Sequence, residues 1–362
     1  MSMQIISGTT RFRIPGATAV AIGKFDGVHL GHRRLLDALL RQKEQGLSPT
    51  VFTFDPSPAV LFGKPGSPDA QELTTREEKR MIFARMGVET LVEYPLDMVT
   101  ASILPEEFIW RILVEQMHAK YIAAGEDLSF GSGGTGDFRL LDALAPCFEY
   151  RTEVIDKVRR NGTVISSTAV RELVAKGCME EAADLLGGPY SVLGEIVHGQ
   201  KIGRTIGFPT LNIVPTRNKL LPPYGVYFSE VRFVGDGEES GDGNEGRIHA
   251  QPKIYRAVTN IGVRPTVTQH TATEETARNE AQETARYDSQ EAAQQSAQGS
   301  CTVVTVETYL YDFEEDAYGR TAVCSLLKYV RPERRFDSLD ALKAQLALDI
   351  AAGREYNPQR EK

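Results

Sequence analysis

The sequence has few of the features that would place it outside ordinary soluble globular proteins. No apolar run approaches the roughly eighteen residues that a membrane-spanning helix needs. Only four cysteines occur in 362 residues, and they are far apart: Cys147, Cys178, Cys301 and Cys324. Isolated cysteines do not indicate a disulfide framework or a zinc site, so we expect reduced thiols.

Basic residues are also in deficit, with 41 Lys and Arg against 49 Asp and Glu and a formal net charge of −8. Binding to nucleic acid depends on a basic surface, so we expect no nucleic-acid partner. The first fifteen residues carry two arginines but no apolar stretch behind them, and we therefore expect no secretory signal. These absences predict a cytoplasmic protein without a membrane partner. No oligomeric state follows from them.

A length of 362 residues favours two domains. The first half of the chain predicts an α/β domain. Apolar strand-like segments, beginning with Thr18–Ile22, alternate with segments of helical spacing. Strands separated by helices indicate βαβ units and a parallel sheet. Ligands bind beyond the carboxyl ends of such strands, where residues 23–32, 55–58 and 125–136 fall.

The second half begins near residue 187 and consists of short β-rich segments separated by turns, which predict a compact barrel. These segments are residues 190–198, 210–213, 225–233, 255–261, 303–311 and 323–329, and a helix over 339–350 follows them. We therefore divide the chain into domains 1–186 and 187–362. Stretches 235–246 and 268–300 hold too few large apolar residues to fold, and we expect disordered insertions in barrel loops.

Residues 23–32, GKFDGVHLGH, lie between a predicted strand and a predicted helix. The spacing of His29 and His32 puts both imidazoles near the helix N-terminus, where free N–H groups favour an anion. Gly23 and Gly31 allow the backbone to approach a phosphate. Histidine donors suit the charge that develops when the α-phosphate of a nucleotide is attacked. Two alternatives are a zinc site, although no third ligand lies nearby, and a purely structural histidine pair.

A second helix start lies at residues 165–171, ISSTAVR. Either Ser167 or Thr168 can cap this helix. Arg171, one turn in, can hold a pyrophosphate because a guanidinium offers a fork of donors. The motif alone fits a plain helix cap equally well, but the histidine motif upstream favours a phosphate site.

The barrel half has its own loop of glycines and cations, which suits phosphates or an ordinary turn. The loop residues are Gly199, Lys201, Gly203 and Arg204. Thr210 and Asn212 lie two apart on a strand, so they share one face and can offer hard oxygen ligands to Mg²⁺. Glu307 lies inside a strand-like segment. It can act as a general base if it points into a pocket, or it is solvated if it points outward.

Over about the first 185 residues these motifs resemble the adenylyltransferase module of prokaryotic bifunctional riboflavin kinase/FAD synthetases. FDPSP at 54–58 and GEDLSFG at 125–131 add to the likeness. The resemblance implies a Rossmann-like nucleotidyltransferase fold in which FMN attacks the α-phosphate of ATP, giving FAD and pyrophosphate. It implies that His29 and His32 stabilise the transition state. It also implies ATP-binding roles for Gly23, Phe25, Asp26, Gly31, Asp127, Ser167, Thr168 and Arg171.

Residues 187–350 are similar to the riboflavin kinase module of the same family, through GEIVHGQKIGRTIGFPTLNI, TNIGVRPT and VETYLYDFEEDAYG. The resemblance implies a six-stranded antiparallel barrel with a C-terminal helix. Thr210 and Asn212 would bind Mg²⁺ and ATP, with Gly199, Lys201, Gly203 and Arg204 around the phosphates. Glu307 would deprotonate the riboflavin hydroxyl that attacks the γ-phosphate. Arg331 and Phe336 are candidate flavin contacts.

The predicted function is therefore bifunctional, with riboflavin, FMN and ATP as substrates and Mg²⁺ as cofactor. Three residues depart from the family pattern. Ser57 stands where histidine is frequent, and Leu128 and Ser129 replace the usual aromatic and basic residues. These departures leave two alternatives: a riboflavin kinase whose adenylyltransferase half is impaired, and a flavin- or nucleotide-binding regulator.

Overall fold

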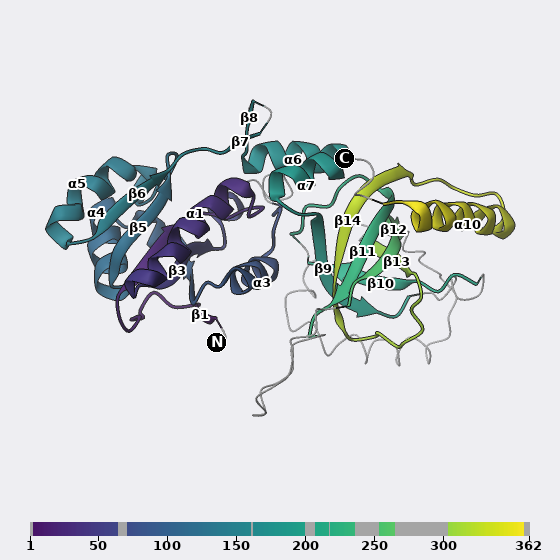
Figure 1. Ribbon diagram of the computed structural model, residues 1–362, viewed down its shortest axis with the longest axis horizontal. Helices are drawn as coiled ribbons and strands as arrows, with labels where there is room; N and C mark the ends of the chain where they lie inside the picture. Colours follow the sequence, from purple (N-terminus) through teal and green to yellow (C-terminus); the bar gives the residue numbers. More distant parts are fainter. Residues whose placement is uncertain are drawn as a thin grey trace.

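The computed structural model describes residues 3–63, 71–160, 162–199, 207–216, 218–235, 253–264 and 303–357. The predicted insertions at 235–246, apart from Gly235, and at 268–300 lie outside these ranges, as do Lys201, Gly203 and Arg204. Figure 1 shows an α/β half, coloured purple to teal, beside a barrel half coloured green to yellow.

The first half is built on a six-stranded sheet in which every neighbouring pair of strands is parallel. The strand order is β1-β4-β3-β2-β5-β6. The strands are β1 (Gln4–Ser7), β2 (Thr18–Ile22), β3 (Ser48–Asp55), β4 (Thr90–Pro95), β5 (Ala119–Gly125) and β6 (Arg151–Ile155). The central strand β2 is buried along its whole length, as expected for a parallel strand covered on both faces. The predicted α/β fold class is confirmed.

Helices cover both faces of this sheet, and the alternation of side chains in β2 shows which helix covers which face. Ala19 and Ala21 share a core with α1 and α3, whereas Val20 and Ile22 share a core with η4 and α5. These helices are α1 (Leu30–Arg41), α3 (Arg76–Met86), η4 (Phe108–Gln116) and α5 (Phe138–Phe148). Shorter elements are η1 (Gln42–Gln45), α2 (Pro58–Phe62), η3 (Thr100–Ser102), η5 (Ser132–Gly134) and the hairpin β7 (Arg159–Arg160) with β8 (Thr163–Val164).

The segment between β4 and β5 is helical, as the pattern from Pro105 to Met117 predicts. It begins as an α-helix in α4 (Pro105–Glu107) and continues as a π-helix in η4. Phe108 and Ile112, like Ile109 and Leu113, are buried pairs four residues apart. This spacing places an apolar face on either kind of helix, so the sequence pattern could not distinguish them.

The second half is a closed barrel of six antiparallel strands, in the order β10-β13-β12-β11-β14-β9. The strands are β9 (Tyr190–Val197), β10 (Leu211–Pro215), β11 (Gly225–Phe233), β12 (Tyr255–Arg264), β13 (Val303–Leu310) and β14 (Thr321–Pro332). The C-terminal helix α10 (Leu339–Glu355) begins where predicted and runs five residues further than position 350. The predicted barrel with a C-terminal helix is confirmed.

The barrel strands have an inner and an outer apolar face. Ile213, Ile261 and Val306 belong to the buried core inside the barrel. On the outer face, Phe228 and Val258 pack in a separate cluster with side chains of the α10 region. Figure 1 shows α10 on the side of the barrel that faces away from the α/β half.

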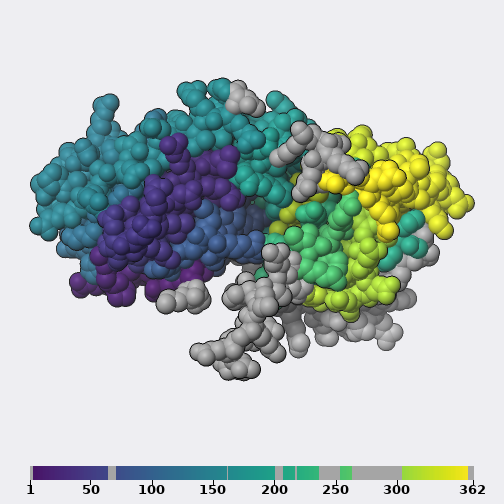
Figure 2. Space-filling model, in the orientation of Figure 1, coloured from purple at the N-terminus to yellow at the C-terminus, as the bar shows by residue number. Residues whose placement is uncertain are grey.

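The two halves meet through α6 (Ser167–Lys176) and α7 (Met179–Leu186). Val170, Met179 and Ala182 of these helices lie in one buried cluster with Tyr190 and Val192 of the barrel. In Figure 2 the surface passes from one half to the other through the teal region to which these helices belong. A shared apolar core therefore joins the two halves.

Candidate active sites

The first site begins at the N-terminus of α1. His29 is the N-cap residue, and its Nδ1 accepts the backbone N–H of His32 at 3.4 Å. The two imidazole rings stack with centroids 3.8 Å apart and planes at 15°. The loop before them adopts positive φ at Phe25 (50°), Gly27 (85°) and Val28 (42°). The predicted placement of both histidines at the helix start is confirmed, and they act as one stacked unit.

Burial keeps both imidazoles neutral near pH 7. It lowers the pKa of His29 to about 4, against the opposing effects of Asp26 and Asp127. Burial also lowers the pKa of His32, and the neighbouring His29 and Lys79 act in the same direction. His32 Nδ1 is buried and has no hydrogen-bond partner among the described residues. A neutral imidazole with an unused nitrogen can bond a phosphate oxygen at this helix end.

The histidine pair lines a cavity of about 750 Å³. Its polar end includes Gly23, Lys24, Ser167 and Thr168 in addition to the two histidines and Gly31. Its other end is apolar and aromatic, with Phe54, Tyr94, Phe108 and Phe130. The cavity opens at the carboxyl ends of the parallel strands, where the sequence predicted ligand binding. Its wall therefore combines imidazole, hydroxyl and lysine groups with aromatic side chains.

Three predicted ATP contacts lie behind the cavity wall. Phe25 is fully buried, with its ring 5.3 Å from that of Phe83. Asp26 Oδ2 accepts a 2.6 Å hydrogen bond from Nη2 of Arg171. These side chains shape the loop from inside.

The start of α6 also differs in detail from its prediction. Ser166 is the N-cap residue, since its side chain accepts the backbone N–H of Ala169, and neither Ser167 nor Thr168 caps the helix. The cap comes one residue early because Ser167 Oγ donates to the carbonyl oxygen of Asp26 at 2.8 Å. The hydroxyls that line the cavity are consequently not used for capping.

Asp127 follows β5 at the cavity rim and is largely exposed, 3.4 Å from Nζ of Lys157. Leu128 and Ser129, which depart from the family pattern, line the same cavity. Ser57 instead stands at the N-cap position of α2, outside the cavity lining. Two of the three departures therefore lie where they can alter ligand contacts.

The second site lies on the barrel, around a cavity of about 400 Å³. Gly199, Thr210 and Asn212 line it, together with His198 and Tyr318, whose rings lie 3.7 Å apart. A side chain at position 199 would collide with Asn212, since an added Cβ would lie 2.1 Å from its Nδ2. Thr210 and Asn212 both line this cavity, as does Leu211 between them, so their sharing of one face stays a prediction.

Glu307 lies on β13, and its Cα is opposite Asn212 of β10 and Asn260 of β12. Its sequence neighbours Val306 and Thr308 are buried inside the barrel, so Glu307 points to the outer face. It is nevertheless half-buried. Neither alternative of the sequence analysis holds in full: Glu307 points outward, but onto a partly covered surface beside Asn212.

Comparisons with known proteins match each half of the chain to a different family model. Residues 12–169 match the family model for FAD synthetase, and residues 186–357 match the model for riboflavin kinase. The bifunctional riboflavin kinase/FMN adenylyltransferase of Escherichia coli strain K12 is 36% identical over 338 residues, covering 93% of this chain and 92% of that protein. This chain belongs to the bifunctional riboflavin kinase/FMN adenylyltransferase family.

Other family members show similar relationships. The Haemophilus influenzae protein of the same name is 31% identical, covering 98% of this chain and 99% of its own length. A crystal structure described as a macrolide-efflux protein from Streptococcus pneumoniae matches with a TM-score of 0.74 and 26% identity, covering 99% of this chain and all of that one. Within the described ranges, no helix of this chain is long and apolar enough to cross a membrane.

The two flavin contacts that the family resemblance implied are placed near α10. Arg331 is engaged with Asp349 of α10, with 2.6 Å between Nη2 and Oδ2. The guanidinium of Arg334 lies over the ring of Phe336, with Cζ 4.6 Å from the ring centroid. Arg331 thus ties the helix to β14, and its contact with flavin, like that of Phe336, stays a prediction.

Sequence reasoning missed several residues that the structure places at the first site. Lys24 and Lys157 add positive charge to the cavity wall, and the aromatic side chains of Phe54, Tyr94 and Phe108 form its apolar end. Lys24 and Phe54 lie within motifs that the sequence analysis quotes, but Tyr94, Phe108 and Lys157 come from separate strands, helices and loops. Only tertiary structure brings them together, so no local pattern indicates them.

Proposed function

We propose that this protein phosphorylates riboflavin to FMN in its barrel domain and adenylylates FMN to FAD in its α/β domain, using ATP in both steps. The main support is the 750 Å³ cavity, in which a stacked histidine pair at a helix N-terminus shares its walls with aromatic side chains. A dinucleotide that carries a flat ring system needs both kinds of wall. We propose domain limits of 1–186 and 187–362, and a cytoplasmic location where ATP and riboflavin meet.

In the adenylyltransferase step, a phosphate oxygen of FMN attacks the α-phosphorus of ATP, and pyrophosphate leaves. His29 and His32 donate hydrogen bonds to the phosphate oxygens on which charge develops, without an enzyme-bound intermediate. The hydroxyls of Ser167 and Thr168 line the same polar end of the cavity. Binding of the triphosphate favours protonation of the imidazoles, which burial otherwise keeps neutral.

In the kinase step, Glu307 takes the proton of the terminal ribityl hydroxyl as that oxygen attacks the γ-phosphorus of ATP. Its half-buried place beside Asn212 keeps the carboxylate next to the proposed phosphate site. ADP leaves, and Glu307 holds the proton that the hydroxyl has given up. The barrel cavity lined by Gly199 and Thr210 would hold the nucleotide phosphates.

The donors at this site fit Mg²⁺. Thr210 offers a hydroxyl and Asn212 an amide oxygen, and the amide of Asn212 packs directly against the backbone of Gly199. Among the described residues, no group of three or more His, Cys, Asp or Glu is placed to hold a metal ion. That suits an ion that keeps water and phosphate oxygens as its other ligands. When bound, Mg²⁺ supplies charge neutralisation for the ATP phosphates.

A time course of flavins separates the three hypotheses. Purified protein is incubated with riboflavin, ATP and Mg²⁺, and riboflavin, FMN and FAD are separated chromatographically. We expect FMN to appear first and FAD with pyrophosphate to follow. FMN that accumulates without FAD would instead support a monofunctional kinase. A folded protein that binds flavin but forms neither product would support the regulator.

A further inference from the structure

Residues 72–75 connect the first site to the barrel. On one side, Asp26 Oδ1 accepts the backbone N–H groups of Leu73 at 2.8 Å and Thr74 at 3.3 Å. Because its other oxygen accepts from Arg171 and its carbonyl accepts from Ser167, Asp26 fixes α6 as well as the phosphate loop. The position of residues 72–75 therefore sets the position of these groups.

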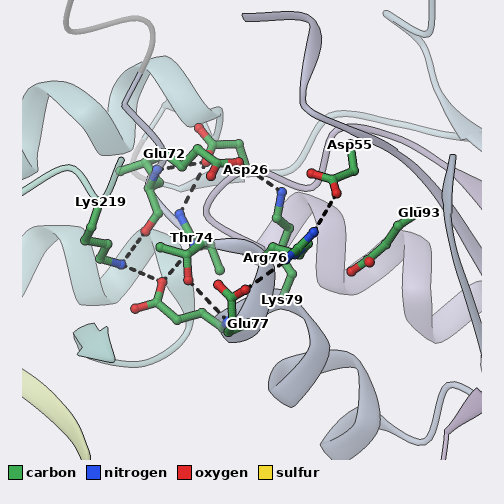
Figure 3. A network of polar contacts seen from close by, with 12 residues as sticks. Asp26, Asp55, Glu72, Thr74, Arg76, Glu77, Lys79, Glu93 and Lys219 are labelled. Carbon is green, nitrogen blue, oxygen red and sulfur yellow. Dashed lines mark hydrogen bonds and ion pairs between the residues drawn. The ribbon is translucent and has the colours of Figure 1, made fainter. Parts of the chain in front are cut away.

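On the other side, the barrel half holds the same residues. Glu72 forms two backbone hydrogen bonds with the loop between β10 and β11, donating to the Asn218 carbonyl at 2.7 Å and accepting from Leu220 N at 2.9 Å. Nζ of Lys219 donates to the Leu73 carbonyl at 2.7 Å and to Glu78 Oε2 at 2.7 Å. Figure 3 shows Lys219 approaching this segment from one side and Asp26 from the other.

Lys219 is buried at this contact between the two halves. Its side chain is only 2% exposed, and Nζ lies 4.3 Å from the centroid of the Tyr190 ring. Its partner Glu78 also accepts the backbone N–H of Leu193 through Oε1 and that of Thr75 through Oε2. A buried ion pair contributes little net stability compared with apolar packing, but it fixes one arrangement of the groups it joins.

We propose that Lys219, a residue of the kinase half, is a positioning residue for adenylyl transfer. It holds residues 72–75 against Asp26, and Asp26 in turn holds Arg171 and the cavity-lining Ser167 at the start of α6. This inference rests on the adenylyltransferase function proposed for the first half. Lys219 does not line the barrel cavity, so we expect the kinase step to depend on it far less.

The test compares both activities in full-length Lys219→Met. We expect kcat for FAD formation from supplied FMN to fall on the order of ten- to a hundredfold, since small misplacements of catalytic groups have effects of this size. The kinase kcat, measured on the same preparation, should stay within about twofold. Lys219→Gln, which can still donate to the Leu73 carbonyl, should lose less. Lys328→Met is the control, because Lys328 pairs with Glu180 of α7 and lies over the ring of Tyr356.

A double-substitution cycle with Asp26→Asn separates positioning from stability. If Lys219 acts through Asp26, the two losses in adenylyl-transfer kcat will be far from multiplicative. Losses that multiply, equal losses in both activities, or full FAD synthesis by Lys219→Met would overturn the inference. A wild-type protein that forms no FAD would refute the proposed adenylyltransferase function itself, which is a different result.

Discussion

Gly199→Ala is the sharpest single perturbation of the kinase site. A Cβ built at this position lies 2.1 Å from Nδ2, 2.7 Å from Cγ and 2.9 Å from Oδ1 of Asn212. All three distances are below 3.0 Å, which real Cβ atoms essentially never show, so the whole amide is in collision. Asn212 is 6% exposed and held in β10 between two strands, so it has little space into which to move.

The size of the effect follows from the shift that the methyl group demands. Restoring a contact of 3.4 Å moves the Asn212 amide or the Gly199 backbone by about 1.3 Å. Both line the same cavity, so either movement displaces a wall of the proposed Mg²⁺·ATP site. A displacement near 1 Å lowers rates by on the order of a hundredfold. We therefore expect a loss of that order in the kinase kcat/KM.

The assay measures FMN formation from riboflavin at several Mg²⁺ and ATP concentrations, with FAD formation from supplied FMN as the internal reference. Gly188→Ala is a matched control, because a Cβ there meets no atom within 4 Å. It should leave both activities unchanged. Kinase activity of Gly199→Ala within a few-fold of wild type, at equal thermal stability, would refute the placement of Asn212 in the metal–nucleotide site.

Three further predictions address the proposed catalytic groups. Replacing His29 and His32 together by asparagine, which can still cap α1, should abolish FAD formation and spare FMN formation; equal loss of both would contradict the division of labour. Glu307→Ala should abolish FMN formation while FMN supplied to the variant is still converted to FAD, as chromatography of the flavins will show. Because the folded-state pKa of His29, about 4, lies below its ordinary 6.5, its contribution to stability is complete above pH 6.5 and is lost as the pH falls toward 4. The full-length wild-type protein should lose about 3 kcal/mol more free energy of unfolding than full-length His29→Asn over that interval, measured by denaturant unfolding; parallel losses would refute the shift.

Much of the architecture could be predicted because its signals are local. The buried run TAVAI, the alternation of strands with helices and the glycine-rich histidine loop each act within about fifteen residues. The direction of Glu307 could not be predicted in this way. Strand periodicity says that Glu307 and Val306 face opposite ways, but only the closure of the barrel and the register with Asn212 decide which face is inside.

The contact of Lys219 with Glu78 and residues 72–75 could not be predicted from the sequence for a related reason. Lys219 and Glu78 are 141 residues apart in the sequence. Lys and Glu side chains are usually exposed, so neither residue indicates by itself that it is buried. The capping residue of α6 was misassigned because Ser166, Ser167 and Thr168 are chemically equivalent as caps. The hydrogen bond from Ser167 to Asp26, formed across 141 residues, decides among them.

These long-range contacts change how the motif GKFDGVHLGH is understood. Its two ends line the cavity, through Gly23 and the two histidines, whereas Phe25 and Asp26 point away from it into the protein. A resemblance to a family assigns ATP binding to the motif as a whole, but the geometry separates groups that can contact ATP from groups that hold them in place. The second kind includes Asp26, which accepts the backbone N–H of Leu73, and Lys219 of the kinase half donates to the carbonyl of the same residue, so contacts from the barrel reach the loop that we propose binds phosphate.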